Sequence, residues 1–285
     1  MGCSNRGRKA SGGTLLLAAL LLGNSAAACT SFECSTSDIA CDNGLNSLIL
    51  ATRYFRPGDL SGLQVWLKAD SLVLNNLDTV TYWPDSSGNS HDASGGVSPS
   101  FRTATLNGRP VMNFNGSQYL NLPTFAQQPA ATPHTLFLVF RTAGTLDETI
   151  LTTTDAPATG RVQLSHTLGC PQQIISTVLS GLTLCYTTTT YTDASWELFE
   201  ISWNLTDISL YSKGALVHTQ SVTATAGGGP WRMGADKTAS TFINGDIAEF
   251  VIYSRALSDY ERREVECYLG WKYGLNSCQN LGIYL

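Results

Sequence analysis

Charged residues are scarce in this 285-residue chain, at 14%, and long apolar runs are scarce as well. The apolar run at residues 15–22 is far shorter than the roughly 18–20 residues of a membrane-spanning helix, and no later run reaches that length. The formal net charge is −5, and without residues 1–28 the balance is 14 basic against 22 acidic residues. This acidic balance argues against nucleic acid partners and against electrostatic attachment to anionic lipid.

Several motifs of catalytic and metal sites are missing. No C-x-x-C pair with a nearby histidine cluster occurs, so a zinc site is not indicated. The Gly-x-Ser-x-Gly elbow of many serine hydrolases is absent too. The four histidines (His91, His134, His166 and His218) are scattered, as is typical of surface or satisfied polar groups.

The chain has no long internal repeat, and its strand patterns do not alternate with long helices, which argues against a parallel α/β sheet. Hydrophobic residues make up 43% of the sequence, enough to bury a core. The length allows one large β-sandwich or two small domains.

The N-terminus has the layout of a secretory signal peptide, which we place at residues 1–28. Arg6, Arg8 and Lys9 precede the apolar run, and small residues follow it up to Cys29. The sequence therefore predicts export, to a bacterial periplasm, outer membrane or cell surface.

Two interpretations of the cleavage site are open. An ordinary signal peptidase would cut after the AAA sequence that ends at Ala28. A bacterial lipoprotein signal would use the same small residues and attach lipid to Cys29, although Ala26 stands where the usual lipobox has leucine. In the second case the membrane contact is the N-terminal lipid alone.

The cysteine count favours lipidation. Of eight cysteines, Cys3 leaves with the signal peptide, and the remaining seven would include an unpaired thiol. If Cys29 carries lipid, six remain. We expect three local disulfides among them, Cys34–Cys41, Cys170–Cys185 and Cys267–Cys278, although six cysteines allow 15 connectivities.

Residues 29–61 are predicted to form a tether with a small cap, and residues 62–285 the main domain. Short alternating segments separated by turn residues predict an all-β fold. These segments are residues 63–69, 80–83, 111–114, 119–122, 135–140, 149–151, 162–165, 182–186, 197–203, 208–211, 215–222 and 242–253.

One short helix is expected near the C-terminus. Ser258 and Glu261 have the spacing of a capping box, and Gly274 is placed to end the helix. Val265 and Leu269 lie on one face at helical spacing, which should pack beside the sandwich.

Four segments resemble bacterial laminin-G-like, concanavalin A-like lectin/glucanase domains. They are GLQVWLKAD with WPDSSGN (residues 62–70 and 83–89), PVMNFNG (110–116), GDIAEFVIYSRALS (245–258) and the helix at 261–275. The resemblance covers about residues 62–275 and implies a jelly-roll sandwich of two antiparallel sheets. It also implies a non-catalytic module that binds a glycan or an extracellular protein, with calcium at a sheet edge in some members. A structural or adhesion lipoprotein that binds only protein is the alternative.

A glycoside hydrolase is a third hypothesis, since related sandwiches include glycanases with Glu-x-Asp-x-x-Glu on one strand. The nearest fragment contains Asp246 and Glu249, but Asn244 occupies the position of the nucleophile. On a regular strand Asp246 and Glu249 would also face opposite sides, and so would Glu197 and Glu200. We therefore predict no catalytic residues.

Candidate ligand-binding residues come from two patterns. Asp85, Asn89 and Asp92 supply oxygen ligands of the kind calcium prefers, and the alternative is that they cap turns. Trp83, Trp231 and Tyr191 adjoin turn residues, which makes them candidates for an exposed aromatic platform under a sugar ring. Trp66 and Trp203 lie within strand patterns and are expected in the core.

Overall fold

A computed structural model describes residues 55–124, 133–143, 147–154, 162–166, 174–179, 182–187, 194–221, 230–275 and 278. At residues 162, 166, 174–179 and 182–187 it describes the backbone alone. The chain divides into a unit Met1–Tyr54 and a unit Phe55–Leu285, and the described residues belong to the second. The predicted leader, Cys29, Cys34 and Cys41 lie outside the described residues.

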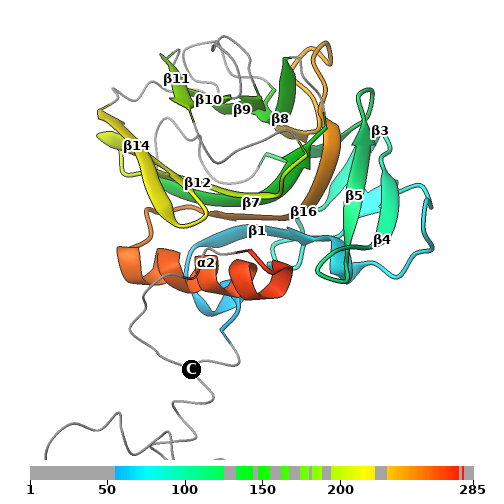
Figure 1. Ribbon diagram of the computed structural model, residues 1–285, viewed down its shortest axis with the longest axis horizontal. Coiled ribbons are helices and arrows are strands. Elements are labelled where there is room, and N and C mark those ends of the chain that lie inside the picture. The colour runs from blue at the N-terminus through cyan, green and yellow to red at the C-terminus, as the bar shows by residue number, and fades with distance from the viewer. Residues whose placement is uncertain are drawn as a thin grey trace, which may run out of the picture. The chain divides into compact units, whose positions relative to one another are not determined.

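Two antiparallel eight-stranded sheets form the sandwich (Figure 1). Sheet A has the order β14-β13-β12-β7-β16-β5-β4, and β1 pairs with β16. Its strands are β1 (Leu63–Lys68), β4 (Ser100–Leu106), β5 (Arg109–Asn115), β7 (His134–Thr142), β12 (Glu197–Trp203), β13 (Asp207–Ser212), β14 (Ala215–Ser221) and β16 (Asn244–Tyr253).

Sheet B has the order β11-β10-β9-β8-β15-β6-β3-β2. Its strands are β2 (Tyr82–Trp83), β3 (Ala93–Val97), β6 (Tyr119–Leu122), β8 (Glu148–Thr153), β9 (Val162–His166), β10 (Ile174–Leu179), β11 (Leu182–Thr187) and β15 (Trp231–Met233). The predicted all-β jelly-roll is confirmed, and each predicted segment contains a strand. Four strands had not been predicted: β3, β4, β10 and β15.

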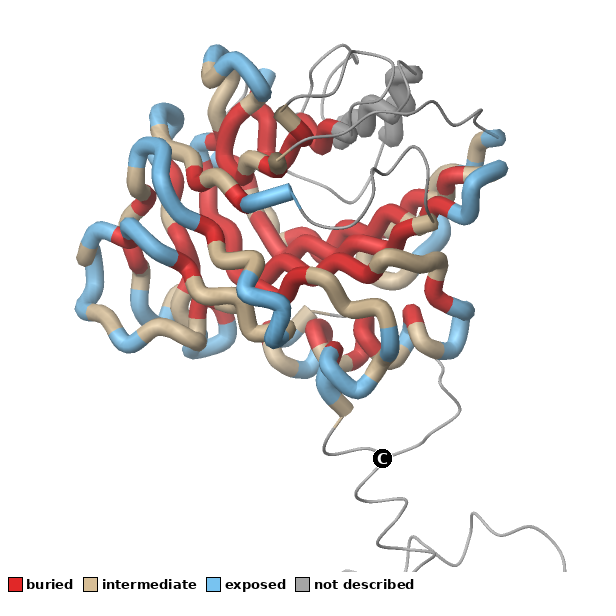
Figure 2. The backbone as a smooth tube through the Cα atoms, turned by 180° about the vertical axis from the view of Figure 1, so that it is seen from behind, coloured by how far each residue is buried: buried red, intermediate tan, exposed pale blue. Residues whose placement is uncertain are grey.

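The molecule has three layers, because both faces of sheet A are covered. One core fills the space between the sheets and includes Leu138, Phe140, Phe199 and Phe250. A second lies between sheet A and the helix and includes Phe137 and Val139, the alternate residues of the same strand. Covering on both sides explains why β7 is apolar almost throughout. Figure 2 shows these buried strands at the centre and exposed loops around them.

Helix α2 (Asp259–Tyr273) lies along the outer side of sheet A (Figure 1). Its predicted capping box is confirmed: Ser258 Oγ accepts from Glu261 N, and Glu261 Oε2 accepts from Ser258 N at 2.9 Å. Gly274 ends the helix in the left-handed conformation, with φ 67°. Within the described part of the chain, no helix has the length and hydropathy needed to cross a membrane.

A buried polar network fixes α2 to sheet A. The carboxylate of Glu249 accepts from Trp66 Nε1 at 2.6 Å, from Lys272 Nζ at 2.7 Å and from Tyr273 OH at 2.7 Å. Lys272 also donates to Asp70 Oδ1 at 2.9 Å. The network satisfies a carboxylate that is 1% exposed and sets the position of the helix along the sheet.

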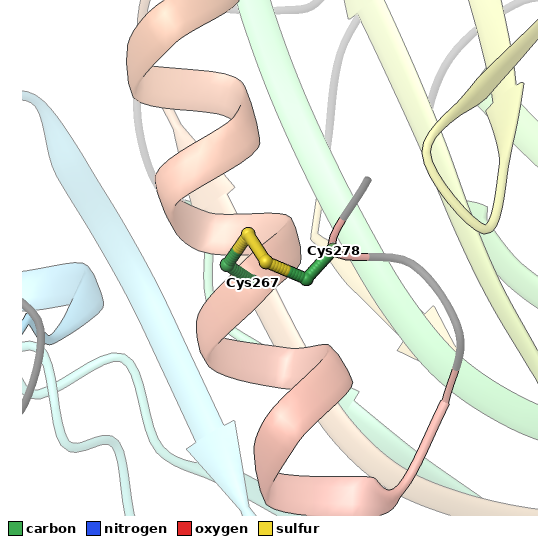
Figure 3. Close-up of a disulfide and its surroundings, with 2 residues drawn as sticks. All are labelled: Cys267 and Cys278. Carbon is green, nitrogen blue, oxygen red and sulfur yellow. A yellow bond between two sulfur atoms is a disulfide. The ribbon is translucent and has the colours of Figure 1, made fainter. Parts of the chain in front are cut away.

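One of the three predicted disulfides is present. Cys267 of α2 is bonded to Cys278 with a Cα–Cα distance of 4.4 Å (Figure 3). Cys170 lies outside the described residues, and Cys185 lies on β11 with only its backbone described.

Residues 55–61, placed in the tether by the sequence, pack on the sandwich. Pro57 is buried in the short helix η2 (Pro57–Asp59), and its carbonyl accepts from Tyr253 OH at 2.8 Å. Arg255 Nε donates to Ser61 O at 2.8 Å. The folded unit therefore begins a few residues before Gly62.

Candidate functional site

A row of polar side chains crosses the outer face of sheet B. Strand pairing aligns Tyr82 with Ser94, Ser94 with Asn121, and Asn121 with Arg232. Arg232 aligns in turn with Thr152, and Thr152 with Gln163. Residues paired across strands lie on the same face, so these side chains form one line. We call Tyr82, Ser94, Asn121, Arg232, Thr152 and Gln163 the polar row.

Tyr82 begins the row on the edge strand β2. Its side chain is 49% exposed. The neighbouring Asp92 side chain, as an acceptor for the hydroxyl, raises the pKa of the phenol. Asp92 Oδ1 also accepts from Asp85 N at 2.7 Å, so the carboxylate beside the ring is held in place. The result is an exposed aromatic ring with a fixed carboxylate next to it.

A bulge in β3 brings the neighbouring strand β6 close to the row. Gly95 and Gly96 have φ values of 70° and 79°, and the pairing register shifts between Ser94 and Val97. Because the two glycines have no side chains, side chains of β6 pack directly against the backbone of β3. The Tyr119 ring lies against Gly96, where an added Cβ would come within 2.6 Å of Tyr119 Cε2.

Arg232 is held rigidly at the centre of the row. Its Nε donates to Asn121 Oδ1 at 3.1 Å, and its Nη1 donates to the carbonyls of Asp236 and Lys237 at 3.0 Å each. The guanidinium carbon lies 4.3 Å from the centroid of the Tyr119 ring. These contacts use Nε and both hydrogens of Nη1, and Nη2 donates to no described residue.

The far end of the row is buried. Thr152 is 0% and Gln163 is 1% exposed. Gln163 Nε2 donates to Ser165 Oγ at 2.8 Å and to Thr149 Oγ1 at 3.3 Å. Among the described residues, Gln163 Oε1 has no hydrogen-bond partner. The accessible part of the row therefore runs from Tyr82 to Arg232.

The predicted tryptophan platform is wrong. Trp83 is 0% and Trp231 is 2% exposed, and both belong to the core between the sheets. The third candidate, Tyr191, lies outside the described residues. In β2 the exposed aromatic side chain is Tyr82, the neighbour of Trp83, because successive strand residues point to opposite faces. Tyr260 and Trp271 of α2 are exposed as well, at 57% and 48%. Trp66 and Trp203 are buried, as expected.

The predicted calcium ligands are engaged in the loop that carries them. Asp85 Oδ1 accepts from Trp66 N at 2.8 Å and Ser87 N at 2.9 Å. Asp85 Oδ2 accepts from Ser87 Oγ at 2.6 Å and His91 N at 3.0 Å. Four bonds fill the lone-pair positions of one carboxylate. No group of three His, Cys, Asp or Glu side chains suited to a metal occurs among the described residues.

The same loop covers the free edge of β1. Asn89 Nδ2 donates to Leu63 O at 2.9 Å and Gln64 O at 3.1 Å, and Ser86 N donates to Trp66 O at 2.8 Å. An uncovered edge strand would invite pairing with another chain. The loop geometry thus matches the turn-capping alternative, with Asp85 as its centre.

The carboxylates of the glycanase fragment are buried and bonded. Asp246 is 1% exposed and accepts from Arg141 Nε at 2.6 Å and Asn113 Nδ2 at 2.8 Å. The expectation that Asp246 and Glu249 face opposite sides is wrong. A bulge between Ile247 and Glu249 shifts the register, so that both side chains lie on the outer face of sheet A.

Glu197 and Glu200 do lie on opposite faces of β12. Glu197 accepts from Ser212 Oγ at 2.6 Å, whereas Glu200 faces α2 and lies 3.2 Å from Arg262 Nη1. Burial raises the pKa of Glu200 well above its usual value, although Arg262 acts against this shift. Burial raises the pKa of Glu197 as well. Both side chains are 0% exposed. Within the described residues, Glu197 Oε2 and Glu200 Oε1 accept no hydrogen bond, although Lys213 Nζ lies 3.6 Å from Glu197 Oε2.

Comparison with known proteins agrees with the fold. Trypanosoma rangeli sialidase in complex with sialic acid matches with TM-score 0.52 and 15% identity, covering 75% of this chain and 33% of that one. The botulinum neurotoxin serotype D binding domain matches with TM-score 0.52 and 13% identity, covering 73% and 52%. The chain thus spans about a third of the sialidase. At these identities the likeness concerns the fold alone.

No curated protein matches the chain. The family model described as the concanavalin A-like lectin/glucanases superfamily matches residues 114–261, about half of the sequence. This match covers β7, β12 and β16 in the centre of sheet A and extends to the first turn of α2. The chain therefore belongs to the concanavalin A-like lectin/glucanases superfamily.

Proposed function

We propose that this protein is a non-catalytic glycan-binding module that uses the exposed part of the polar row. One observation carries the proposal: Tyr82, 49% exposed, stands beside the fixed carboxylate of Asp92 and in line with Ser94 and Asn121. An aromatic face covers the apolar face of a sugar ring, while nearby amide, hydroxyl and carboxylate groups bind its hydroxyls.

Two similarities in fold support this proposal. The sialidase was solved with sialic acid, and the neurotoxin domain is described as a binding domain. The non-catalytic part is supported by the burial of Asp246, Glu249, Glu197 and Glu200, each bonded within the fold. A glycosidase would need a pair of accessible carboxyl groups on either side of the scissile bond.

A glycan array tests the proposal, run with and without calcium on the wild-type protein and on a Tyr82→Ala variant. We expect the wild type to bind a defined set of glycans and the variant to lose that binding while it keeps its circular dichroism spectrum. Absence of binding by folded wild-type protein under both conditions would contradict a glycan-binding role.

A protein-binding role is the second candidate, and two exposed apolar side chains favour it. Val73 is 99% and Leu77 is 65% exposed in the connection between β1 and β2. If the folded chain binds no glycan, a Val73→Ser, Leu77→Ser variant tests this role. Loss of a specific envelope partner from that variant, compared with wild type, would support adhesion through protein alone.

The proposal places the module outside the cytoplasm, anchored by lipid on Cys29. It is supported by the leader pattern and by the cysteine count, in which lipidation leaves an even number. Mass spectrometry of the mature N-terminus tests this part. A diacylglyceryl-modified Cys29 is the expected result, and an unmodified Cys29 would contradict the anchor.

A further inference from the structure

We infer that the polar row recognises an acidic oligosaccharide, with the sugar carboxylate bound by Arg232. This inference rests on the proposed function and adds to it the chemical class of the glycan and its orientation. It is carried by the hydrogen bonds that hold Arg232, by the three strand spacings between Tyr82 and Arg232, and by the position of Asp92 near the Tyr82 end.

Arg232 forms no ion pair with an acidic side chain among the described residues. Its partners are the side-chain carbonyl of Asn121, the backbone carbonyls of Asp236 and Lys237, and the ring of Tyr119. All four are neutral groups. A partly buried guanidinium that is fixed but not neutralised favours an anion, because charge-assisted hydrogen bonds are about twice as strong as neutral ones.

The carboxylate of Asp236, four residues along the chain, forms no ion pair with Arg232. Asp236 contributes only its backbone carbonyl to Arg232, and its carboxylate turns back into its own loop. There it accepts from Thr238 Oγ1 at 2.6 Å, Ser240 N at 2.6 Å and Thr241 N at 3.0 Å. Partial burial would raise the pKa of Asp236, but these hydrogen bonds lower it to about 2.

The free donors of Arg232 are confined to one nitrogen. Because Nε and Nη1 are used within the fold, the two hydrogens of Nη2 remain to donate to a ligand. Stacking on Tyr119 keeps the guanidinium plane fixed, and the Tyr119 ring is itself seated against Gly96. Arg232 is thus preorganised as a donor before a ligand arrives.

The row also sets the orientation of the ligand. Tyr82 and Arg232 are separated by three strand spacings, about 14 Å at roughly 4.8 Å each. This span fits a short oligosaccharide better than a single sugar ring. Asp92 beside Tyr82 would repel a carboxylate at that end, so the acidic sugar lies at Arg232 and a neutral ring at Tyr82.

Between the two ends Ser94, Gly95 and Gly96 are exposed. The Tyr119 ring, packed against Gly96, borders this part of the surface on the side of Arg232. Ser94 and Asn121 offer hydroxyl and amide groups to the sugar hydroxyls at the middle of the span. Asn121 thereby serves two purposes, since its Oδ1 also holds Arg232.

The test compares matched ligands on the unmodified protein. Oligosaccharides of a uronic acid and sialylated oligosaccharides are each assayed by calorimetry, beside the same compounds with their carboxyls reduced to alcohols. We expect the acidic form of one class to bind about 10- to 100-fold more tightly than its reduced form, as loss of a charged hydrogen bond predicts. The class that shows the difference identifies the acidic sugar.

Variants provide the second arm. Arg232→Gln should abolish the preference for the acidic form, whereas Lys237→Gln removes an exposed positive charge from the adjacent loop and should retain it. Thermal melting establishes that each variant is folded. Arg232→Lys keeps the charge but not the planar stacking on Tyr119, and it should give intermediate affinity.

The outcomes separate the two proposals. Equal affinity for acidic and reduced oligosaccharides overturns the role of Arg232 and leaves glycan binding intact. Failure of the wild type to bind any glycan overturns the proposed function and this inference together. Preference for acidic sugars that survives in Arg232→Gln but is lost in Lys237→Gln would assign the carboxylate to the loop instead.

Discussion

Tyr82 and Trp83 are adjacent in β2, yet their side chains lie on opposite faces of sheet B. Trp83 is 0% exposed, and its Nε1 donates to Lys68 O at 3.0 Å between the sheets. Tyr82 is 49% exposed on the outer face, where the neighbouring Asp92 raises the pKa of its phenol. One dipeptide thus contributes an anchor to the core and an aromatic ring to the surface.

Substitution of the two residues should separate stability from binding. Trp83→Ala removes a fully buried ring, so the free energy of unfolding should fall by about 3–5 kcal/mol. Tyr82→Ala removes an exposed ring and should change it by less than about 1 kcal/mol. Urea denaturation measures both. An equal loss of stability in the two variants would contradict the assignment of faces.

The sequence located this surface to within one residue but selected the wrong side of the strand. Trp83 adjoins a turn, which indicates exposure, but a two-residue strand contains no alternation from which to assign faces. The pairing of Trp83 with the buried Ala93 of β3 places Trp83 on the inner face, but the sequence did not predict β3. Gly95 and Gly96 weaken the strand pattern of β3, since glycine has low β-propensity.

Bulges and long-range contacts account for the other differences. Regular alternation predicted opposite faces for Glu197 and Glu200 correctly, because β12 pairs without a register shift. It failed for Asp246 and Glu249, where β16 contains a bulge that no local residue pattern reveals. Local signals were sufficient to predict the ends of α2, because a capping box and a terminal glycine act within a few residues of the helix ends.

Asp85 should stabilise the edge of β1, and its contribution to the free energy of unfolding should not depend on calcium. Asp85→Asn places an amide against backbone N–H groups that now donate to a carboxylate. Loss of charged hydrogen bonds should lower the free energy of unfolding by about 1.5–3 kcal/mol or more. Denaturation should give the same wild-type value in calcium and in chelator.

Asn89→Ala is the matched control in the same loop. This variant removes the hydrogen bonds that the exposed Asn89 side chain donates to Leu63 O and Gln64 O. The free energy of unfolding should therefore fall by less than in Asp85→Asn. Stabilisation of the wild type by calcium that disappears in Asp85→Asn would contradict this view and restore the metal-site hypothesis.

Glu200 should make the fold less stable as the pH rises. Its pKa is raised by burial in the folded protein, so the folded state keeps the proton at pH values where the unfolded chain has released it. The contribution of Glu200 is therefore fully present below the unfolded value of about 4.3, and stability is lost as the pH rises from there toward the folded pKa. Glu197 acts in the same direction.

Glu200→Gln carries no ionisable group at this position and should show a smaller loss of stability between pH 5 and pH 8 than wild type. Thermal melting across that range measures the slope. Asp259→Asn is the control for loss of a carboxylate beside Arg262: Asp259 Oδ1 lies 3.9 Å from Arg262 Nε, but its side chain is 84% exposed, so this variant should keep the wild-type slope. An unchanged slope in Glu200→Gln would show that Arg262 keeps Glu200 ionised at every pH tested.

The Cys267–Cys278 disulfide should stabilise the end of the sandwich by restricting the unfolded chain. The two cysteines are separated by 11 residues, and closure of a loop of this size contributes about 3 kcal/mol in the chain-entropy model. Cys267 is 3% exposed on α2, so Cys278→Ser tests the bond with less disturbance of the helix than substitution of Cys267. The free energy of unfolding should fall by about that amount. Reductant should then have a smaller effect on Cys278→Ser than on wild type, and equal effects would show that other disulfides dominate the response.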